Sequence, residues 1–327
     1  MKKLIKRGFA ALLALTLALG MSVSAFAADG TAVAKKDYQL TNEGTTSPAE
    51  TFQFTVTKVG VTDATKTDGT PLTTDDMPDL TIAPVTYAAG EAGSATSVKD
   101  LVVTPAKDFP NVGIYTYKVT ETAGNTAGVT YGNRQMELKA TVYHDSATNE
   151  MKVAYAFKVD GNKDDNIVNT YSAGSLEVGK TVSGTLGNKT QKFNIRVTFT
   201  APEGETVNST ITYGDKTITP EDFAASSTRT VHVDISLADG EKMLFNNVPY
   251  GVTYAVEEYE YEGYTTSYGN TKNGTIDSLK TIVHIHNAKE GSVDTGVILH
   301  SAPYILLLVG VGAAAVAFLI LRKHREV

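Results

Sequence analysis

Apolar and polar side chains alternate along short stretches of this chain, and the same order of stretches occurs twice. Residues 51–57 (TFQFTVT) place an apolar side chain at every second position, and residues 193–199 (FNIRVTF) repeat this pattern. Such alternation is typical of half-buried β-strands. Residues 30–290 contain no long amphipathic helix pattern, and turn-forming residues separate the stretches at the spacing of β-sandwiches. We therefore predict an all-β protein.

The stretch from Asn169 to Lys180 marks the boundary between the two units. A chain of 327 residues is long for one domain and natural for two. We predict two tandem immunoglobulin-like sandwiches, an N-terminal domain over residues 28–172 and a C-terminal domain over residues 173–290. Residues 60–80, rich in Thr, Asp and Gly, are expected to form a surface loop or a small insertion.

A lysine, a glutamate and an asparagine interrupt the apolar faces in the same order in both units. These residues are Lys36, Glu121 and Asn169 in the first unit, and Lys180, Glu258 and Asn287 in the second. The two-residue period favours Glu258 over Glu257 and Lys36 over Lys35, although Lys35 remains the alternative. A charged side chain on an inward face is unusual, because charged residues are rarely buried unless they have a partner or a chemical role.

A buried lysine beside a buried glutamate and an asparagine has a specific chemistry available to it. Burial lowers the pKa of an amine and raises that of a carboxyl. A neutral amine can attack the asparagine side chain, expel ammonia and leave an isopeptide bond, while the carboxyl carries the proton. We expect a Lys36–Asn169 bond promoted by Glu121 and a Lys180–Asn287 bond promoted by Glu258. Folding supplies the proximity, so no cofactor is required.

A single lysine, glutamate or asparagine in a strand is more often an ordinary solvated residue. The repetition of the whole set favours the bond, and so does the absence of cysteine from the chain. Extracellular proteins of this size commonly use disulfides. In this chain either the hydrophobic cores suffice alone or another covalent link replaces the disulfides.

Both ends of the chain carry targeting signals. Residues 1–27 combine a basic start, an apolar run and a small-x-small site at Ala25–Ala27, which indicates a secretory signal peptide. A second apolar run, residues 304–321, is long enough for a transmembrane helix, and a basic tail follows it. The part between them is expected to lie outside the cell.

Composition excludes several functions. The net charge of −7 makes nucleic acid an unexpected partner. No Ser-His-Asp order or phosphate-binding loop is present, so we do not expect an enzyme acting on other molecules. His284 and His286 share a strand face but lack a third ligand, and no metal is predicted.

A pentapeptide, Ser292 to Gly296 (SVDTG), precedes the apolar run and basic tail. This arrangement resembles a sortase cell-wall sorting signal, which implies cleavage between Thr295 and Gly296. The pentapeptide differs from the common LPxTG form at its first residue and at its proline position, and pilin variants of the form (E/Q)VPTG come nearer. We assign residues 291–327 to this signal.

Together these features make the chain similar to Gram-positive pilus shaft subunits with Cna-B-like domains. The resemblance is carried by KDYQL at Lys36, YKVTE ending at Glu121, VGKTVSG around Lys180, VEE ending at Glu258 and the two asparagine strand ends. It implies a covalent fibre in which a pilin-type sortase joins Thr295 to a lysine of the next subunit. In similar pilins that lysine precedes the first domain's asparagine, which implies Lys163, with Lys158 as the alternative.

The resemblance also implies a location and partners. The protein would be anchored in the cell wall as part of a pilus, with minor pilins as further partners and contact with the membrane only through the C-terminal helix before sorting. The alternative function is a monomeric wall-anchored adhesin that binds a host ligand.

Overall fold

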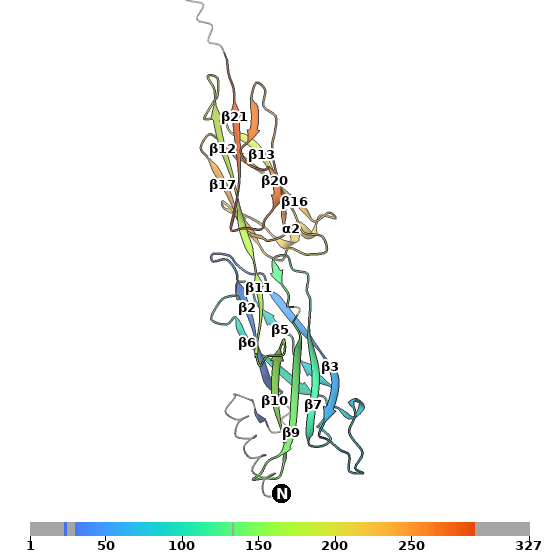
Figure 1. Cartoon of the computed structure of the whole chain (residues 1–327). Coiled ribbons are helices and arrows are strands. Elements are labelled where there is room, and N and C mark those ends of the chain that lie inside the picture. Colours follow the sequence, from blue (N-terminus) through green and yellow to red (C-terminus); the bar gives the residue numbers. More distant parts are fainter. Residues whose placement is uncertain (1–22, 25–29, 133, 292–327) are drawn as a thin grey trace, which may run out of the picture.

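The computed structural model describes residues 23–24, 30–132 and 134–291. The predicted signal peptide, apart from residues 23–24, and the predicted membrane helix over residues 304–321 lie outside the described residues. Within the described ranges, none of the helices has the length and apolar character needed to cross a membrane. The predicted all-β fold is confirmed, because two β-sandwiches follow one another along the chain (Figure 1).

The first sandwich consists of a six-stranded and a five-stranded sheet. The larger sheet has the order β1-β10-β9-β7-β3-β5, with β1 Val23–Ser24, β3 Glu50–Thr62, β5 Val85–Tyr87, β7 Gly113–Thr122, β9 Met136–His144 and β10 Met151–Val159. The smaller sheet has the order β4-β6-β2-β11-β8, with β2 Thr31–Leu40, β4 Leu80–Ile82, β6 Val98–Pro105, β8 Val129–Thr130 and β11 Asn166–Tyr171.

The second sandwich repeats this plan with a six-stranded and a four-stranded sheet. The larger sheet has the order β15-β14-β17-β12-β21-β19, with β12 Ala173–Ser183, β14 Ile211–Tyr213, β15 Lys216–Ile218, β17 Lys242–Pro249, β19 Thr265–Tyr268 and β21 Lys280–Ala288. The smaller sheet has the order β16-β13-β18-β20, with β13 Phe193–Thr200, β16 Thr230–Leu237, β18 Thr253–Glu258 and β20 Asn273–Thr275. Two short helical turns, η1 (Thr74–Asp76) and α2 (Pro220–Ala224), are the helical elements described.

Apart from the two-residue β1, the first and last strands of each sandwich lie side by side. β2 pairs with β11, and β12 pairs with β21. Both pairs are parallel, although nearly every other pairing in the molecule is antiparallel. The start and the end of each sandwich are therefore neighbours within one sheet.

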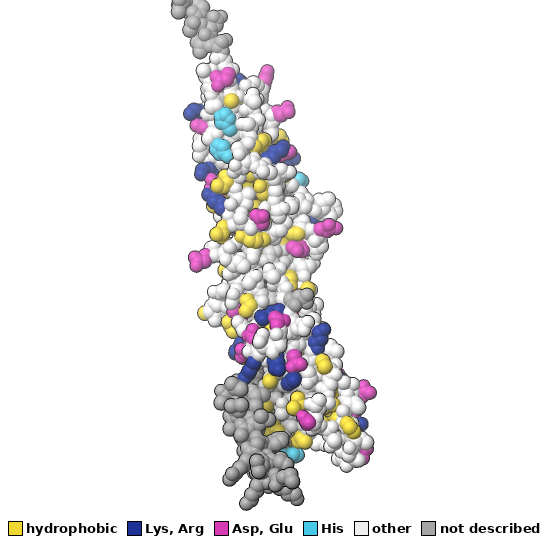
Figure 2. All heavy atoms as spheres, viewed as in Figure 1, with side chains coloured by type: hydrophobic (Ala, Val, Ile, Leu, Met, Phe, Trp, Pro, Cys, Tyr) yellow, Lys and Arg dark blue, Asp and Glu magenta, His cyan; other side chains and the backbone are white. Residues whose placement is uncertain are grey.

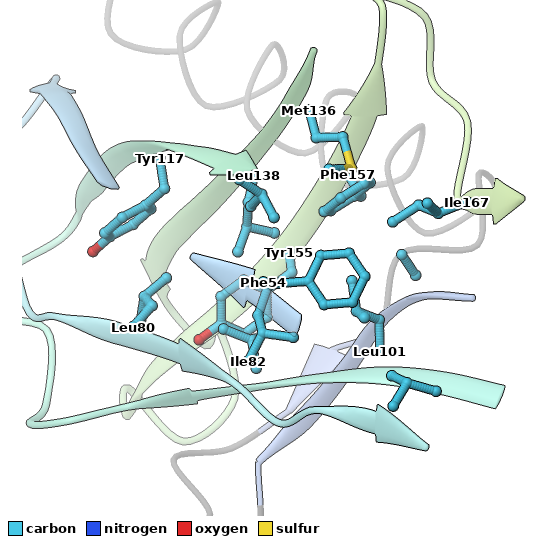
Figure 3. Close-up of a cluster of buried hydrophobic side chains, with 14 of the residues drawn as sticks. Phe54, Leu80, Ile82, Leu101, Tyr117, Met136, Leu138, Tyr155, Phe157 and Ile167 are labelled. Atoms are coloured by element: carbon cyan, nitrogen blue, oxygen red, sulfur yellow. The ribbon is translucent and has the colours of Figure 1, made fainter. Parts of the chain in front are cut away.

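The inward faces of the sheets form two hydrophobic clusters, one in each sandwich. Figure 3 shows the first cluster, in which Phe54, Tyr117, Leu138 and Phe157 project from the six-stranded sheet into the space between the sheets. The alternation of buried and exposed residues along β7 illustrates how the two-residue period produces this face.

Residues 60–80 are more than the surface loop or insertion expected from their composition. β3 extends to Thr62, and Leu72 and Met77 are buried in the first cluster, with 7% and 0% of their surface exposed. The few apolar residues of this polar stretch pack into the first cluster, which composition alone did not reveal.

The two sandwiches are connected end to end through a very short link (Figure 1). One residue, Ser172, separates β11 from β12. The Asn247 side chain accepts a hydrogen bond from the backbone nitrogen of Thr46 and donates one to its carbonyl oxygen, both 3.0 Å long. Thr126 and Thr206 form a parallel bridge across the same junction. Hydrogen bonds on several sides of the link thus join the sandwiches.

Acidic and basic side chains are interspersed over the face shown in Figure 2. They form no single basic patch on that face, which agrees with the acidic net charge of −7.

Candidate functional site

Lys36 lies on β2 with its side chain inside the first sandwich. None of that side chain is exposed. Its neighbours on the inward face, Ala34 and Tyr38, are also buried. Lys35, the alternative, is half exposed and forms an ion pair with Asp100 at the surface. Of the two lysines, Lys36 is therefore the one held in the core.

Glu121 approaches Lys36 from the opposite sheet, at the end of β7. Its Oε2 atom accepts a hydrogen bond of 3.2 Å from Lys36 Nζ, and its Oε1 atom accepts one from Asn169 Nδ2. Asn169 lies on β11 and is 1% exposed. One buried carboxyl therefore contacts both the amine and the carboxamide.

The second sandwich contains the same arrangement. Lys180 Nζ on β12 forms a buried ion pair with Glu258 Oε2, with the two atoms 2.7 Å apart. Asn287 Nδ2 on β21 donates a hydrogen bond to Glu258 Oε1. Glu257, the alternative, is exposed and paired with Lys272. The structure thus brings together both predicted sets of residues, which we call the first and second triads.

The parallel strand pairs place each lysine and asparagine on the same face. Ile167 is the register partner of Lys36 and precedes Asn169 by two residues. The second sandwich has the same offset, because Ile285 is the partner of the lysine and precedes the asparagine by two. Residues two apart on a strand share a face, so both side chains enter one core from neighbouring strands.

A phenylalanine ring lies beside each lysine amine. Lys36 Nζ is 4.3 Å from the ring centroid of Phe52, and Lys180 Nζ is 4.5 Å from that of Phe193. Both rings are fully buried. They are the first apolar residues of the two repeated stretches, but the sequence pattern did not indicate their contact with the lysines. The rings exclude water while still stabilising a cation by their electrostatic quadrupole.

Burial changes the protonation of the lysines. It lowers the pKa of Lys36 to about 8, and the negative charge of Glu121 opposes this shift only in part. Burial also lowers the pKa of Lys180, against the opposing influence of Glu258. At pH 7 roughly a tenth of Lys36 amines would then be neutral, and the neutral amine is the nucleophilic form.

The carbonyl oxygens of both asparagine side chains are buried without a hydrogen-bond partner among the described residues. An unpaired buried oxygen costs about 1–3 kcal/mol. Each carboxamide is therefore held through its nitrogen alone, and its carbonyl is surrounded by the core.

Two further residues adjoin the triads and were not predicted. Thr266 Oγ1 on β19 donates a hydrogen bond of 3.3 Å to Glu258 Oε1. A Cβ atom on Gly132 would lie 3.5 Å from Asn169 Oδ1 and 3.8 Å from Glu121 Oε2. Thr266 is one of many threonines in polar stretches, and Gly132 follows no motif, so neither carried a sequence signal.

The residues predicted for assembly lie away from the triads. Lys163 is exposed in the turn between β10 and β11, and Lys158 is half-buried on β10. Thr295 and Gly296, the predicted cleavage site, lie outside the described residues.

The two histidines considered as metal ligands have other partners. His284 Nε2 is 3.0 Å from Thr181 Oγ1, and His286 Nε2 is 2.9 Å from Ser183 Oγ. Over the ranges that the structure describes, no group of three or more metal-binding side chains occurs.

Two tandem β-sandwiches, each with a buried Lys-Glu-Asn triad between its first and last strands, are the features expected of isopeptide-containing surface pilins. Comparison with known proteins agrees with this class. Residues 32–172 match the FctA family, described as a Spy0128-like isopeptide containing domain, and residues 174–289 match a domain of unknown function, DUF7601. These matches make the chain similar to Gram-positive shaft pilins.

Individual relatives cover most of the chain. It is 28% identical over 308 residues to a protein named Pilin from Streptococcus pyogenes serotype M1, which covers 85% of this chain and 87% of that protein. The crystal structure of the major pilin from Streptococcus pyogenes superposes with a TM-score of 0.50 at 22% identity, over 80% of this chain and all of that one. The major pilin of serotype GAS13637 gives a TM-score of 0.50 at 20% identity, over 82% and 99% of the two chains. The structural likeness concerns the fold.

Proposed function

We propose that this protein is the repeating shaft subunit of a covalent surface pilus and that each sandwich is cross-linked by a self-formed isopeptide bond. The bonds join Lys36 to Asn169 and Lys180 to Asn287. One observation carries the proposal: in each sandwich a single buried carboxyl contacts both the lysine amine and the asparagine carboxamide.

The reaction requires no group beyond the triad. The neutral lysine Nζ attacks the asparagine Cγ, and the new Nζ–Cγ bond forms. A proton passes from Nζ to Oε2 of the glutamate, and the carboxyl delivers a proton to Nδ2. The Cγ–Nδ2 bond then breaks and ammonia leaves. The apolar core keeps water away from the carboxamide, so hydrolysis does not compete.

The position of the bonds suits a fibre under tension. Each would join the first strand of a sandwich to its last, and these strands are parallel neighbours. Force applied along the chain would pass through the covalent bond and the adjacent strand, and most of the sandwich would carry no load.

Assembly would use the two ends of the subunit. A pilin-type sortase would cleave after Thr295 and join its carbonyl to Lys163 of the next subunit, or to Lys158. The mature protein would be extracellular and anchored in the cell wall.

Intact-mass spectrometry of the recombinant ectodomain tests the bonds. The mass should fall below that calculated from the sequence by two molecules of ammonia. An ectodomain with its full calculated mass would contradict the proposal. Tandem mass spectrometry of native wall material should find Thr295 joined to a lysine, and high-molecular-weight ladders would distinguish a shaft subunit from a monomeric adhesin.

A further inference from the structure

The carboxyl of the second triad has a hydrogen-bond donor that the first triad lacks. Glu258 Oε1 accepts hydrogen bonds from Asn287 Nδ2 and from Thr266 Oγ1, the latter 3.3 Å long. Thr266 on β19 lies directly opposite Asn287 on β21. Directly opposed residues project to the same side of a sheet, so the threonine and the asparagine reach the glutamate together.

The first triad has no corresponding hydroxyl. The described side chains that donate to Glu121 are Lys36 and Asn169. The neighbour on the side of β8 is Gly132, which has no side chain, and the hydroxyl of the adjacent Tyr131 donates to Glu50 instead, at 3.1 Å. The two triads therefore differ in the presence of a hydroxyl beside the carboxyl.

The carboxyl group of a glutamate rotates within a broad torsional well, so its two oxygens need partners to stay in place. Glu258 Oε2 lies 2.7 Å from Lys180 Nζ in a buried ion pair. Contacts at both oxygens fix the rotation of the carboxyl, and the donors to Oε1 are Asn287 Nδ2 and Thr266 Oγ1. The same strand also holds the glutamate backbone, because Glu258 N donates to Tyr268 Oη at 3.0 Å.

We propose that Thr266 is a positioning residue for the Lys180–Asn287 bond. Its hydroxyl holds the Glu258 carboxyl with Oε2 toward the amine and Oε1 toward the carboxamide nitrogen. This inference rests on the proposed self-formed bond and identifies the group that orients its proton carrier. The carboxyl gives a proton from Oε1 to Nδ2 and accepts the Nζ proton on Oε2, so it begins and ends the step neutral, and a rotated carboxyl would interrupt the transfer.

Two substitutions separate the hydroxyl from the bulk of the side chain. Thr266→Val keeps the branched shape and removes the hydroxyl, whereas Thr266→Ser keeps the hydroxyl and removes the methyl group. The full chain is synthesised in a cell-free system, samples are quenched in denaturant at intervals, and the two cross-linked peptides are quantified by mass spectrometry. The Lys36–Asn169 peptide from the same molecules is the internal control.

Thr266→Val is expected to slow formation of the Lys180–Asn287 bond about tenfold, with the first bond unchanged and Thr266→Ser close to the wild-type rate. Equal rates for valine and threonine would overturn the inference, and so would a serine variant as slow as the valine variant, because packing alone would then explain the effect. Both outcomes leave the proposed function standing. If neither cross-linked peptide is found in the wild-type chain, the proposed isopeptide bonds, and with them the proposed function, are contradicted.

Discussion

Lys180 and Asn287 lie on the two strands that begin and end the second sandwich, and both side chains contact the carboxyl of Glu258. The first sandwich repeats this relationship with other residues and the same strand register. All the groups of both triads are buried within their sandwiches or nearly so.

Replacing an asparagine should remove one bond and leave the other. Asn169→Ala should lack the cross-link of the first sandwich, and its mass should fall below the value calculated for the variant by one molecule of ammonia instead of two. A cross-link that closes a loop of more than a hundred residues stabilises by about 5 kcal/mol, so the melting temperature of that sandwich should fall by roughly 10 °C or more. Calorimetry and intact mass check both effects. Asn246→Ala, at an exposed position on β17, is the control and should change neither.

Each glutamate should be required for its own bond. Glu121→Gln keeps the shape of the side chain but cannot carry the proton, so the Lys36–Asn169 bond should fail to form in folded protein. The Lys180–Asn287 bond in the same molecules should form normally. Circular dichroism establishes folding and peptide mapping locates the bonds. Complete cross-linking of the first sandwich in this variant would show that the carboxyl is dispensable.

The space beside Gly132 should matter for the first bond. Gly132→Leu would place a branched side chain against Asn169 and Glu121, whose atoms lie 3.5 and 3.8 Å from the site of a Cβ atom. We expect loss of the first bond only. Gly132→Ala adds one carbon at ordinary contact distance and should leave the bond intact. Peptide mapping distinguishes the two variants. An intact bond in the leucine variant would contradict the close packing of Gly132 against Asn169 and Glu121.

Stability should depend on pH when Lys36 remains an amine, as it does in Asn169→Ala. Its pKa is about 8 in the folded chain and 10.5 in the unfolded chain, so the unfolded chain holds a proton that the folded chain releases. Stability should therefore rise with pH between these values. The gain from pH 7 to 9.5 should be on the order of 2 kcal/mol. Chemical denaturation measures it, and the double variant Lys36→Met/Asn169→Ala should lack this gain.

The junction between the sandwiches should depend on Asn247. Its side chain forms hydrogen bonds of 3.0 Å to the backbone of Thr46 and to the carbonyl oxygen of Thr210. Asn247→Ala should leave both isopeptide bonds intact but increase bending between the sandwiches, because the two hydrogen bonds to Thr46 across the junction are lost. Small-angle scattering of the ectodomain should report a broader distribution of lengths. An unchanged distribution would assign the rigidity to the other contacts across the junction, such as the Thr126–Thr206 bridge.

The sequence predicted the parts of this architecture that depend on local periodicity. Alternation identified the strands and placed Lys36 and Glu258 on inward faces, because a two-residue period decides which face a side chain occupies. It could not predict contacts between strands that are distant in sequence. Thr266 and Gly132 adjoin the triads only because β19 lies beside β21 and the segment after β8 lies beside β11. No local sequence pattern indicates which strands are neighbours in a sheet.

The short link through Ser172 has a consequence for length. With both bonds formed, the unlinked chain between them runs only from Asn169 to Lys180, and nearly all of it already lies in β11 and β12. A strand is close to the full reach of its backbone, at about 3.3 Å per residue. A force applied to the subunit would therefore extend this segment of backbone very little. The filament would be almost inextensible.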